Sequence, residues 1–234
     1  MKKKYVIENL VYDELGKTVL RMHNERFRDA DHIDDHHRYK ENEPISFSNT
    51  IRALSYNQIL TEITKGERKL LSPHGLLKYW GSIPEIKMTY ADTNAIAVYP
   101  NGDDTNETLR KVVLEMIGER YQSIEVPLLV IGIGVKKDRR MKSGFTFIET
   151  EHMQVKEAPF LLKGGKIIYS GENGIISSEE GIQLYVPPRN SGLRGVFRNR
   201  DSMIGADGHE FFVSDKHSRV QVIREEKNLE SKID

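Results

Sequence analysis

Hydrophobic positions follow their clearest pattern between Ala95 and Val135. An apolar run from Ala95 to Tyr99 is followed by a polar turn, and a second apolar run covers Val126 to Val135. Between them, apolar residues recur at the i, i+3, i+4, i+7 and i+8 spacing of a helix face. They are Leu109, Val112, Val113, Met116 and Ile117. Strand, helix and strand in succession predict a parallel strand pair joined by a right-handed crossover.

The residues before this unit predict a hairpin followed by two helices. Strand-like runs at Tyr5 to Tyr12 and Thr18 to Met22 flank a turn, which is typical of a hairpin. The periodic segment from Ser48 to Thr64 predicts a helix whose N-cap is its first serine. Ser72 and Pro73 predict the start of a short second helix, because proline is favoured at the first helical position.

Strand patterns dominate the rest of the chain. The runs Ile83 to Ala91 and Ala95 to Tyr99 predict a hairpin whose turn is Asp92-Thr93-Asn94. Beyond Val135, short strand-like runs are separated by turn residues, which favours an antiparallel meander. These runs are Phe145 to Val155, Pro159 to Lys163, Lys166 to Ser170, Ile175 to Ser178, Ile182 to Val186, Leu193 to Phe197, Glu210 to Val213 and Arg219 to Arg224.

Together these patterns predict an α+β fold. Helices concentrate in the first half around the strand-helix-strand unit, and the second half forms an antiparallel meander in a curved mixed sheet. We expect a single domain over residues 1–234 with a sub-boundary near 136–143. Within it we expect a long polar loop at 24–43 and a frayed tail at 225–234.

The composition excludes several classes of site. The chain contains no cysteine, so disulfides, thiolate chemistry and cysteine-ligated zinc are excluded. The 35 basic and 35 acidic side chains cancel, so no overall charge steers the protein toward a partner, although local patches can remain. No apolar run reaches the about 20 residues that a membrane span needs. We therefore expect a cytoplasmic protein with no membrane partner.

Two basic segments carry the strongest indication of a partner. One follows the second apolar run at 136–142, and the other is rich in glycine, asparagine and proline at 187–200. Their cationic side chains are Lys136, Lys137, Arg139 and Arg140 in the first segment, and Arg189, Arg194, Arg198 and Arg200 in the second. Lysine and arginine on flexible backbone are suited to phosphate contacts. If the two segments share one face they predict a nucleic-acid-binding strip; the alternative is a pair of solvated turns.

Glu85 and Lys87 are candidates for catalysis. The Glu85-Ile86-Lys87 triplet resembles the carboxylate-x-lysine pair of PD-(D/E)xK nucleases, in which the carboxylate holds a divalent metal and the lysine assists the attacking water. The pair lies one strand earlier than in that family, and the strand-like run Ala95 to Tyr99 carries no charged residue. The alternative is a chance pair on a half-exposed strand.

The polar segment Asp29 to His37 is a candidate metal site, with His32, Asp35 and His36 as ligands. Asp35-His36-His37 resembles the motif of DHH phosphoesterases in its letters, although a polar loop precedes it here. His32 to His37 is similar to the H-x-H-x-D-H signature of metallo-β-lactamases, with aspartate and histidine exchanged at two positions. The resemblances imply a divalent metal; the alternative is a solvated loop.

The remaining candidates are isolated side chains. His209 and Asp215 near the C-terminal end are suited to acid–base chemistry without a metal. His74 and His152 stand alone in the sequence, which is typical of surface histidines. The turn Asn101 to Glu107 lies between a strand and a helix, where ligands bind in α/β folds, but its carboxylates are also explained as helix capping.

The leading hypothesis from the sequence is a nucleic-acid-binding protein that cleaves DNA or excises bases as a hydrolase, with a divalent metal as the candidate cofactor. The first alternative is a non-enzymatic subunit of a larger viral or phage assembly, in which case the protein forms homo-oligomers. A small-ligand binder that uses the turn Asn101 to Glu107 is the second alternative.

Overall fold

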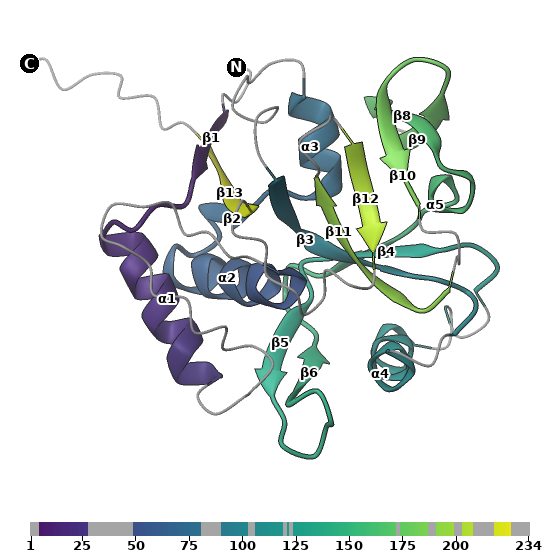
Figure 1. The fold of residues 1–234 in the computed structure, drawn as a ribbon. Coiled ribbons are helices and arrows are strands. Elements are labelled where there is room, and N and C mark those ends of the chain that lie inside the picture. Colours follow the sequence, from purple (N-terminus) through teal and green to yellow (C-terminus); the bar gives the residue numbers. More distant parts are fainter. Residues whose placement is uncertain are drawn as a thin grey trace, which may run out of the picture.

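The centre of the fold is a large mixed sheet built around the strand β3 (Tyr90–Val98), as the computed structural model shows (Figure 1). The structure describes residues 5–27, 49–80, 90–102, 106–118, 121, 124–171, 174–186, 191–198, 203–207 and 218–225. The strand order is β1-β13-β3-β11-β12-β10-β8-β9. The bounds are β1 Tyr5–Asn9, β13 Ser218–Glu225, β11 Leu193–Arg198, β12 Met203–Asp207, β10 Ile182–Tyr185, β8 Gly165–Tyr169 and β9 Ile175–Ser178.

Three further strands join this sheet, and a separate hairpin lies beside it. The strand β2 pairs with β13, β4 pairs with β3, and β7 pairs with β4. The bounds are β2 Arg68–Leu70, β4 Leu128–Ile131 and β7 Gln154–Glu157. The hairpin consists of β5 Gly134–Lys137 and β6 Phe145–Ile148.

One edge of β3 divides between two different neighbours. The other edge is occupied by β11 along nearly its whole length. On the divided edge, β13 pairs in parallel with residues 90–92, and β4 pairs antiparallel with residues 95–98. Between them, the Asn94 N–H donates to the Leu71 carbonyl (3.3 Å) and the Asn94 carbonyl accepts from the Gly132 N–H (2.7 Å). We call this division the fork.

The helices begin at side-chain caps that the sequence supplies. Asp13 caps α1 by accepting from the Gly16 N–H at 2.9 Å, and Asn49 caps α2 by accepting from the Arg52 N–H at 2.8 Å. Ser72 caps α3, whose first residue is the predicted proline. The bounds are α1 Glu14–Arg26, α2 Thr50–Ile63, α3 Pro73–Tyr79, α4 Glu107–Ile117 and α5 Phe160–Lys163.

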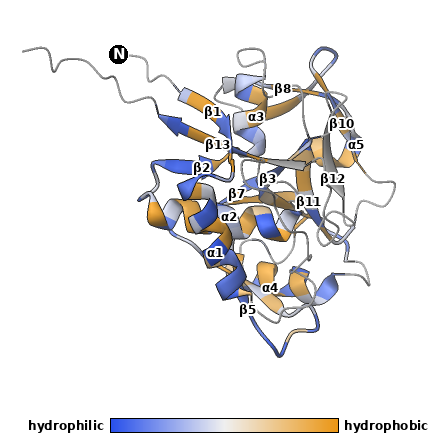
Figure 2. Ribbon diagram, turned by 60° about the vertical axis from the view of Figure 1, so that its left-hand side comes forward, coloured by the Kyte–Doolittle hydropathy of each residue, from blue (hydrophilic) through white to orange (hydrophobic). Residues whose placement is uncertain are grey.

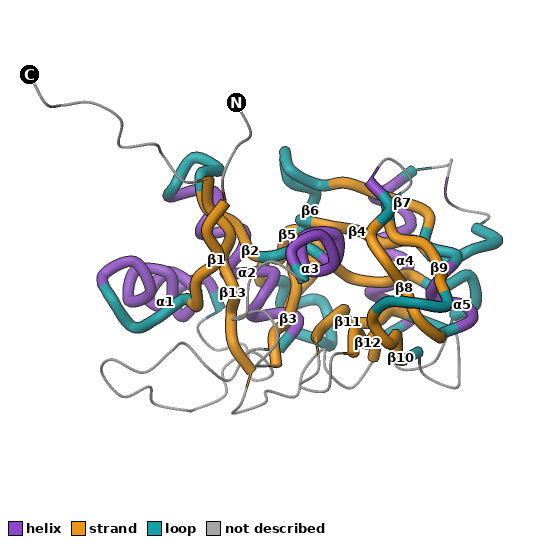
Figure 3. The backbone as a smooth tube through the Cα atoms, turned by 90° about the horizontal axis from the view of Figure 1, so that it is seen from above, coloured by secondary structure: helices purple, strands orange, loops and turns teal. Residues whose placement is uncertain are grey.

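Alternate residues of β3 divide the core into two layers. Ala95 and Ala97 face a cluster that includes Leu76 of α3, whereas Ile96 and Val98 face a cluster that includes α4 and the β5–β6 hairpin. A third cluster lies between α1, α2 and the β13–β2 pair. Each large side chain buried in these layers contributes roughly 1.5–3 kcal/mol of transfer free energy. Figure 2 shows apolar residues concentrated along the central strands, and Figure 3 shows α3 over the sheet between β13 and β8.

The α+β class and the mixed sheet are confirmed, but the predicted parallel crossover is wrong. The strands β3 and β4 that flank α4 pair antiparallel, with Ala95 opposite Ile131 and Val98 opposite Leu128. The predicted apolar run from Val126 to Val135 is also two strands. Gly132 has φ +72° and turns the chain out of β4, so that β5 continues in the separate hairpin.

The predicted first hairpin is wrong because residues 18–22 are helical. The cap at Asp13 starts α1 directly after β1, and the buried side chains of Val19 and His23 lie one helical turn apart. The segment predicted as a strand at 159–163 contains the short helix α5, and the predicted strand at 145–155 divides into β6 and β7. The predicted strand at 210–213 lies outside the described residues.

The predicted turn at Asp92-Thr93-Asn94 is wrong as well, because these residues continue β3 through the middle of the sheet. All three are buried. Thr93 Oγ1 donates to the Val196 carbonyl at 2.6 Å, and Asn94 bridges the fork with its backbone. In the second half, β8 pairs antiparallel with β9 and β10, whereas β10 pairs in parallel with β12. The meander is therefore part of a mixed sheet.

Candidate functional site

All of the side chains predicted for catalysis or metal binding lie outside the described residues. They are Glu85, Lys87, His209 and Asp215 and the metal candidates His32, Asp35 and His36; Arg189 and Arg200 of the predicted nucleic-acid interface also lie outside. Their roles stay predictions. Within the ranges that the structure covers, no group of three or more histidine, aspartate or glutamate side chains has the arrangement of a metal site.

The first basic segment forms the end of β5 and the turn of the β5–β6 hairpin. Lys136 of β5 is exposed, and so are Arg139 and Arg140 of the turn. The Arg140 guanidinium donates to both Asp138 carboxylate oxygens, at 3.0 Å from Nε and 2.8 Å from Nη2. These hydrogen bonds, together with one from the Arg140 N–H, lower the pKa of Asp138 to about 2. One cation of the turn is therefore paired with the turn's own acid at neutral pH.

The described arginines of the second basic segment lie on the opposite face of β3 from this turn. Arg194 is opposite Ala97, so its side chain shares the face of the α3 layer. Arg198 is fully buried on that same side, with its guanidinium 5.9 Å from the centre of the Trp80 ring. Burial lowers the pKa of Arg198 to about 10. The structure does not bring these arginines together with the β5–β6 turn.

A pocket of about 510 Å³ opens at the fork instead. Leu70 and Leu71 line it from the β2 side, Ile131 and Gly132 from the end of β4, and Ile223 from β13. Crevices form where neighbouring strands of a sheet diverge, and such places commonly bind ligands. The pocket is therefore the main candidate functional site in the described part of the chain.

Two asparagine side chains form the floor of the pocket. Asn57 projects from α2, and its Oδ1 accepts from the Leu70 N–H at 3.0 Å. Asn94 Nδ2 lies 3.5 Å from the same oxygen. Both side chains are buried, with 3% and 4% exposure respectively. The Oδ1 atom of Asn94 has no hydrogen-bond partner among the described residues, which leaves a polar atom unsatisfied beside the pocket.

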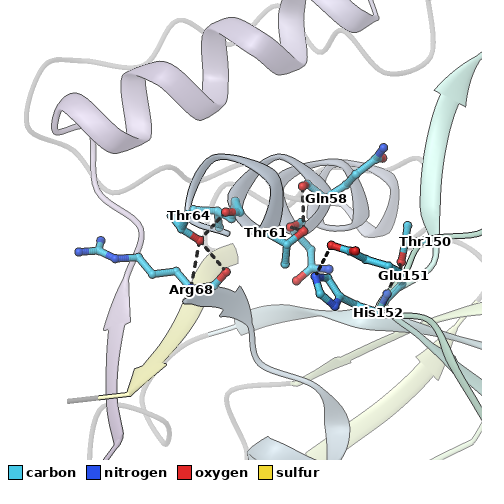
Figure 4. Close-up of polar contacts among 10 residues, drawn as sticks. Gln58, Thr61, Thr64, Arg68, Thr150, Glu151 and His152 are labelled. Atoms are coloured by element: carbon cyan, nitrogen blue, oxygen red, sulfur yellow. Dashed lines mark hydrogen bonds and ion pairs between the residues drawn. The ribbon is translucent and has the colours of Figure 1, made fainter. Parts of the chain in front are cut away.

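A turn at residues 149–153 forms one wall. Thr150 Oγ1 donates to the Gly132 carbonyl at 2.6 Å, and the His152 N–H donates to Thr150 Oγ1 at 3.3 Å. A side chain at position 132 would lie 2.9 Å from the His152 carbonyl oxygen, so the close approach requires glycine. Figure 4 shows Glu151 and His152 next to Thr61 of α2, and His152 Nε2 lies 3.2 Å from Glu151 Oε1.

Lysine and tyrosine side chains surround the opening. The lysines are exposed and come from three separate elements, β2, α3 and β7. They are Lys69, Lys78 and Lys156. Glu151 is the one carboxylate in the described lining, so the lining carries more positive than negative charge. Tyr5 and Tyr79 pack with ring centres 5.8 Å apart on one side, and Tyr169 lies on the other.

His74 of α3 also lines the pocket, beside Tyr169 at a ring distance of 6.4 Å. Burial, with a further contribution from the Lys156 charge, lowers the pKa of His74 to about 4. The imidazole is therefore neutral at pH 7. Its Nδ1 is buried without a hydrogen-bond partner in the part of the structure that is described. The positive charge of the pocket thus comes from its lysines.

The sequence patterns did not indicate this pocket. The sequence predicts a turn at Asn94, and the helix predicted around Asn57 rests on its apolar residues alone. A polar residue inside an apolar strand or helix is the one signal that was present, since burying an amide requires a partner.

The described helices include none that is long and apolar enough to cross a membrane. Comparison with known proteins adds no relative: no family model, no curated protein and no solved structure matches the chain.

Proposed function

We propose that this protein binds nucleic acid and holds one nucleotide of a strand in the fork pocket. The observation that carries the proposal is the order of chemical groups in the pocket, with amides at the floor and lysines at the opening. A nucleotide has the complementary order, since its base edge bears hydrogen-bonding groups and its phosphates are anionic. The volume of about 510 Å³ lies in the range of small-ligand sites.

The opening supports contacts with a strand on both sides of the bound nucleotide. Lys69, Lys78 and Lys156 are exposed on three elements, so their ammonium groups can reach neighbouring phosphates while the base lies inside. Tyrosine rings provide stacking surfaces that tolerate any base. Tyr5, Tyr79 and Tyr169 line the pocket and would take this role.

We propose in addition that hydrolysis of the bound nucleic acid, by cleavage or base excision, is the reaction of this site. In the pocket, the imidazole of His74 is neutral at pH 7, so a ring nitrogen can accept a hydrogen bond from water or substrate, but its pKa of about 4 makes it a weak base. The residues predicted for catalysis from the sequence lie outside the described ranges, so a divalent requirement and the roles of Glu85 and His209 remain to be tested by turnover in Mg²⁺ and in chelator.

The proposal is tested by binding of a labelled single-stranded oligonucleotide at two or more salt concentrations. Replacement of the three pocket lysines, Lys69, Lys78 and Lys156, by alanine should weaken binding by roughly 100-fold and lower the slope of log affinity against log salt by about 2, because each phosphate contact on a single strand contributes about 0.7. The matched control replaces Lys111, Lys163 and Lys166, which are exposed lysines outside the pocket.

A third variant separates the pocket from the interface that the sequence predicted. It replaces Lys136, Arg139 and Lys142 of the β5–β6 turn by alanine. A loss of binding in this variant, with none in the pocket variant, would overturn the proposal and favour the turn. The assembly alternative stays a prediction. Val11, Ile176 and Tyr185 are the large hydrophobic side chains that are exposed among the described residues, and the alternative would need self-association of the purified protein.

A further inference from the structure

We infer that the floor of the fork pocket selects for a base edge that carries an N–H group, which donates to Oδ1 of Asn94. This inference rests on the proposed function and specifies what the pocket recognises. It depends on which atom of each floor amide is the oxygen, and the backbone around the fork determines that assignment.

The orientation of Asn57 follows from its backbone partner. The Leu70 N–H is a donor, so the Asn57 atom 3.0 Å away has to be the acceptor Oδ1. The Asn94 atom that lies 3.5 Å from this oxygen has to be the donor Nδ2, because two amide oxygens at that distance would repel. The other terminal atom of the Asn94 carboxamide, the one that does not face Asn57, is therefore the acceptor Oδ1.

The backbone of Asn94 leaves this oxygen without an internal donor. Its own N–H donates to the Leu71 carbonyl, and its carbonyl accepts from the Gly132 N–H. The side chain is 4% exposed, and Oδ1 has no partner among the described residues. Neighbouring atoms cover Oδ1 in this conformation, so a ligand N–H reaches it only when the carboxamide turns toward the pocket and gives up the 3.5 Å contact from Nδ2 to Asn57. A ligand N–H would then satisfy a buried acceptor that is otherwise unpaired.

The same assignment fixes the direction in which a nucleotide enters. A phosphate or carboxylate at the floor would place its oxygens against the Asn94 oxygen, whereas at the opening it meets Lys69, Lys78 and Lys156. The base edge therefore enters first. Adenine, cytosine, guanine and thymine each carry an N–H on that edge, so the floor accepts all four bases and rejects analogues that lack the donor.

The experiment compares a short deoxyadenosine oligonucleotide with the same oligonucleotide built from purine deoxyriboside, which lacks the 6-amino group and adds no bulk. We expect the purine oligonucleotide to bind roughly 10-fold more weakly to the wild-type protein, which is the effect of leaving one buried acceptor unpaired. A second pair, deoxythymidine and N3-methyldeoxythymidine oligonucleotides, should show a loss in the same direction.

The Asn94→Leu variant tests whether this residue is responsible. With its fold checked by circular dichroism, it should bind the two adenine-type oligonucleotides equally. Equal binding of both oligonucleotides by the wild-type protein would overturn the inference and leave the proposed function intact. Absence of binding to any oligonucleotide would instead overturn the proposed function itself.

Discussion

The fork pocket and the β5–β6 turn are both rich in cations, but they gather them in different ways. The turn takes its cations from seven consecutive residues, 136–142, and pairs Arg140 with Asp138 of the same turn. The pocket takes Lys69 and Lys78 from two neighbouring elements, β2 and α3, and Lys156 from β7, which lies far along the chain. A run of basic residues in the sequence therefore identifies a solvated turn. The group of lysines around the pocket exists only in the folded protein, because the sheet brings their elements together.

The two regions also differ in how their polar groups are supported. In the pocket, Asn57 and Asn94 are buried and held by backbone hydrogen bonds across the fork. In the turn, the Arg140 side chain is 89% exposed and its partner is two residues away. Buried polar groups with fixed partners produce a site of defined shape, while exposed pairs are screened by water. Changes in the pocket should therefore have larger effects than changes in the turn.

The largest effect is expected for Gly132→Ala, at the wall of the pocket. Residue 132 has φ +72°, and an added Cβ would lie 2.9 Å from the His152 carbonyl oxygen. Alanine is strained in this left-handed backbone conformation, and its Cβ would displace the 149–153 turn. Together these effects should lower the free energy of unfolding by roughly 3 kcal/mol. Denaturant unfolding followed by circular dichroism measures the loss.

Gly171→Ala is the matched control for that substitution. Gly171 has φ +50°, and a Cβ built there meets no atom within 4 Å. Only the backbone contribution remains, so we expect a loss of about 1 kcal/mol. Equal losses in the two variants would show that the approach of the 149–153 turn to Gly132 is not tight, and the described shape of the pocket wall would then be wrong.

A second test concerns a buried polar group whose protonation makes the free energy of unfolding depend on pH. His23 of α1 is 2% exposed and its Nδ1 lies 2.9 Å from Ser55 Oγ. Burial, with the charges of Arg52 and Arg26, lowers the pKa of His23 to about 3. The unfolded chain binds this proton near pH 6.5, so stability is complete above pH 6.5 and declines as the pH falls toward 3.

The expected decline is about 2 kcal/mol between pH 6.5 and pH 5 for His23 alone. His74, with a pKa of about 4, acts in the same direction but less strongly because it is partly exposed. Unfolding free energies measured at several pH values for the wild-type protein and for His23→Gln give the slope. A slope that does not change in the variant would mean that His23 is accessible to protons in the folded state.

Local sequence signals predicted the elements of this fold better than their pairing. The proline after Ser72 and the apolar stripe at 109–117 predicted α3 and α4, because caps and helix faces depend on neighbouring residues. The antiparallel pairing of β3 with β4 was not predictable in this way. It depends on Gly132 leaving the sheet and on β13, more than 120 residues later, taking the other part of the β3 edge.

The pocket was missed for the same reason. Its floor joins a helix residue, Asn57, to a strand residue, Asn94, and neither is unusual in its own segment. Arg198 was expected in a nucleic-acid interface because arginine is usually exposed, but register places it in the core beside Trp80. The pocket floor and the burial of Arg198 both depend on which distant residues meet in the folded chain, and a single sequence does not show these contacts directly.

The smallest effect is expected for Arg140→Ala in the β5–β6 turn. Removing the guanidinium should raise the pKa of Asp138 from about 2 toward its ordinary value of 3.8, because the hydrogen bonds from Arg140 are the main cause of the lowered pKa. The unfolding midpoint at pH 7 should change little, since the Arg140 side chain is 89% exposed and water and salt screen its charge, although Asp138 is only 10% exposed. Titration of the Asp138 carboxyl by NMR and thermal unfolding of the same sample measure the two quantities. A marked loss of stability would show that the turn is held by its ion pair, and the contrast between a supported pocket and a solvated turn would then fail.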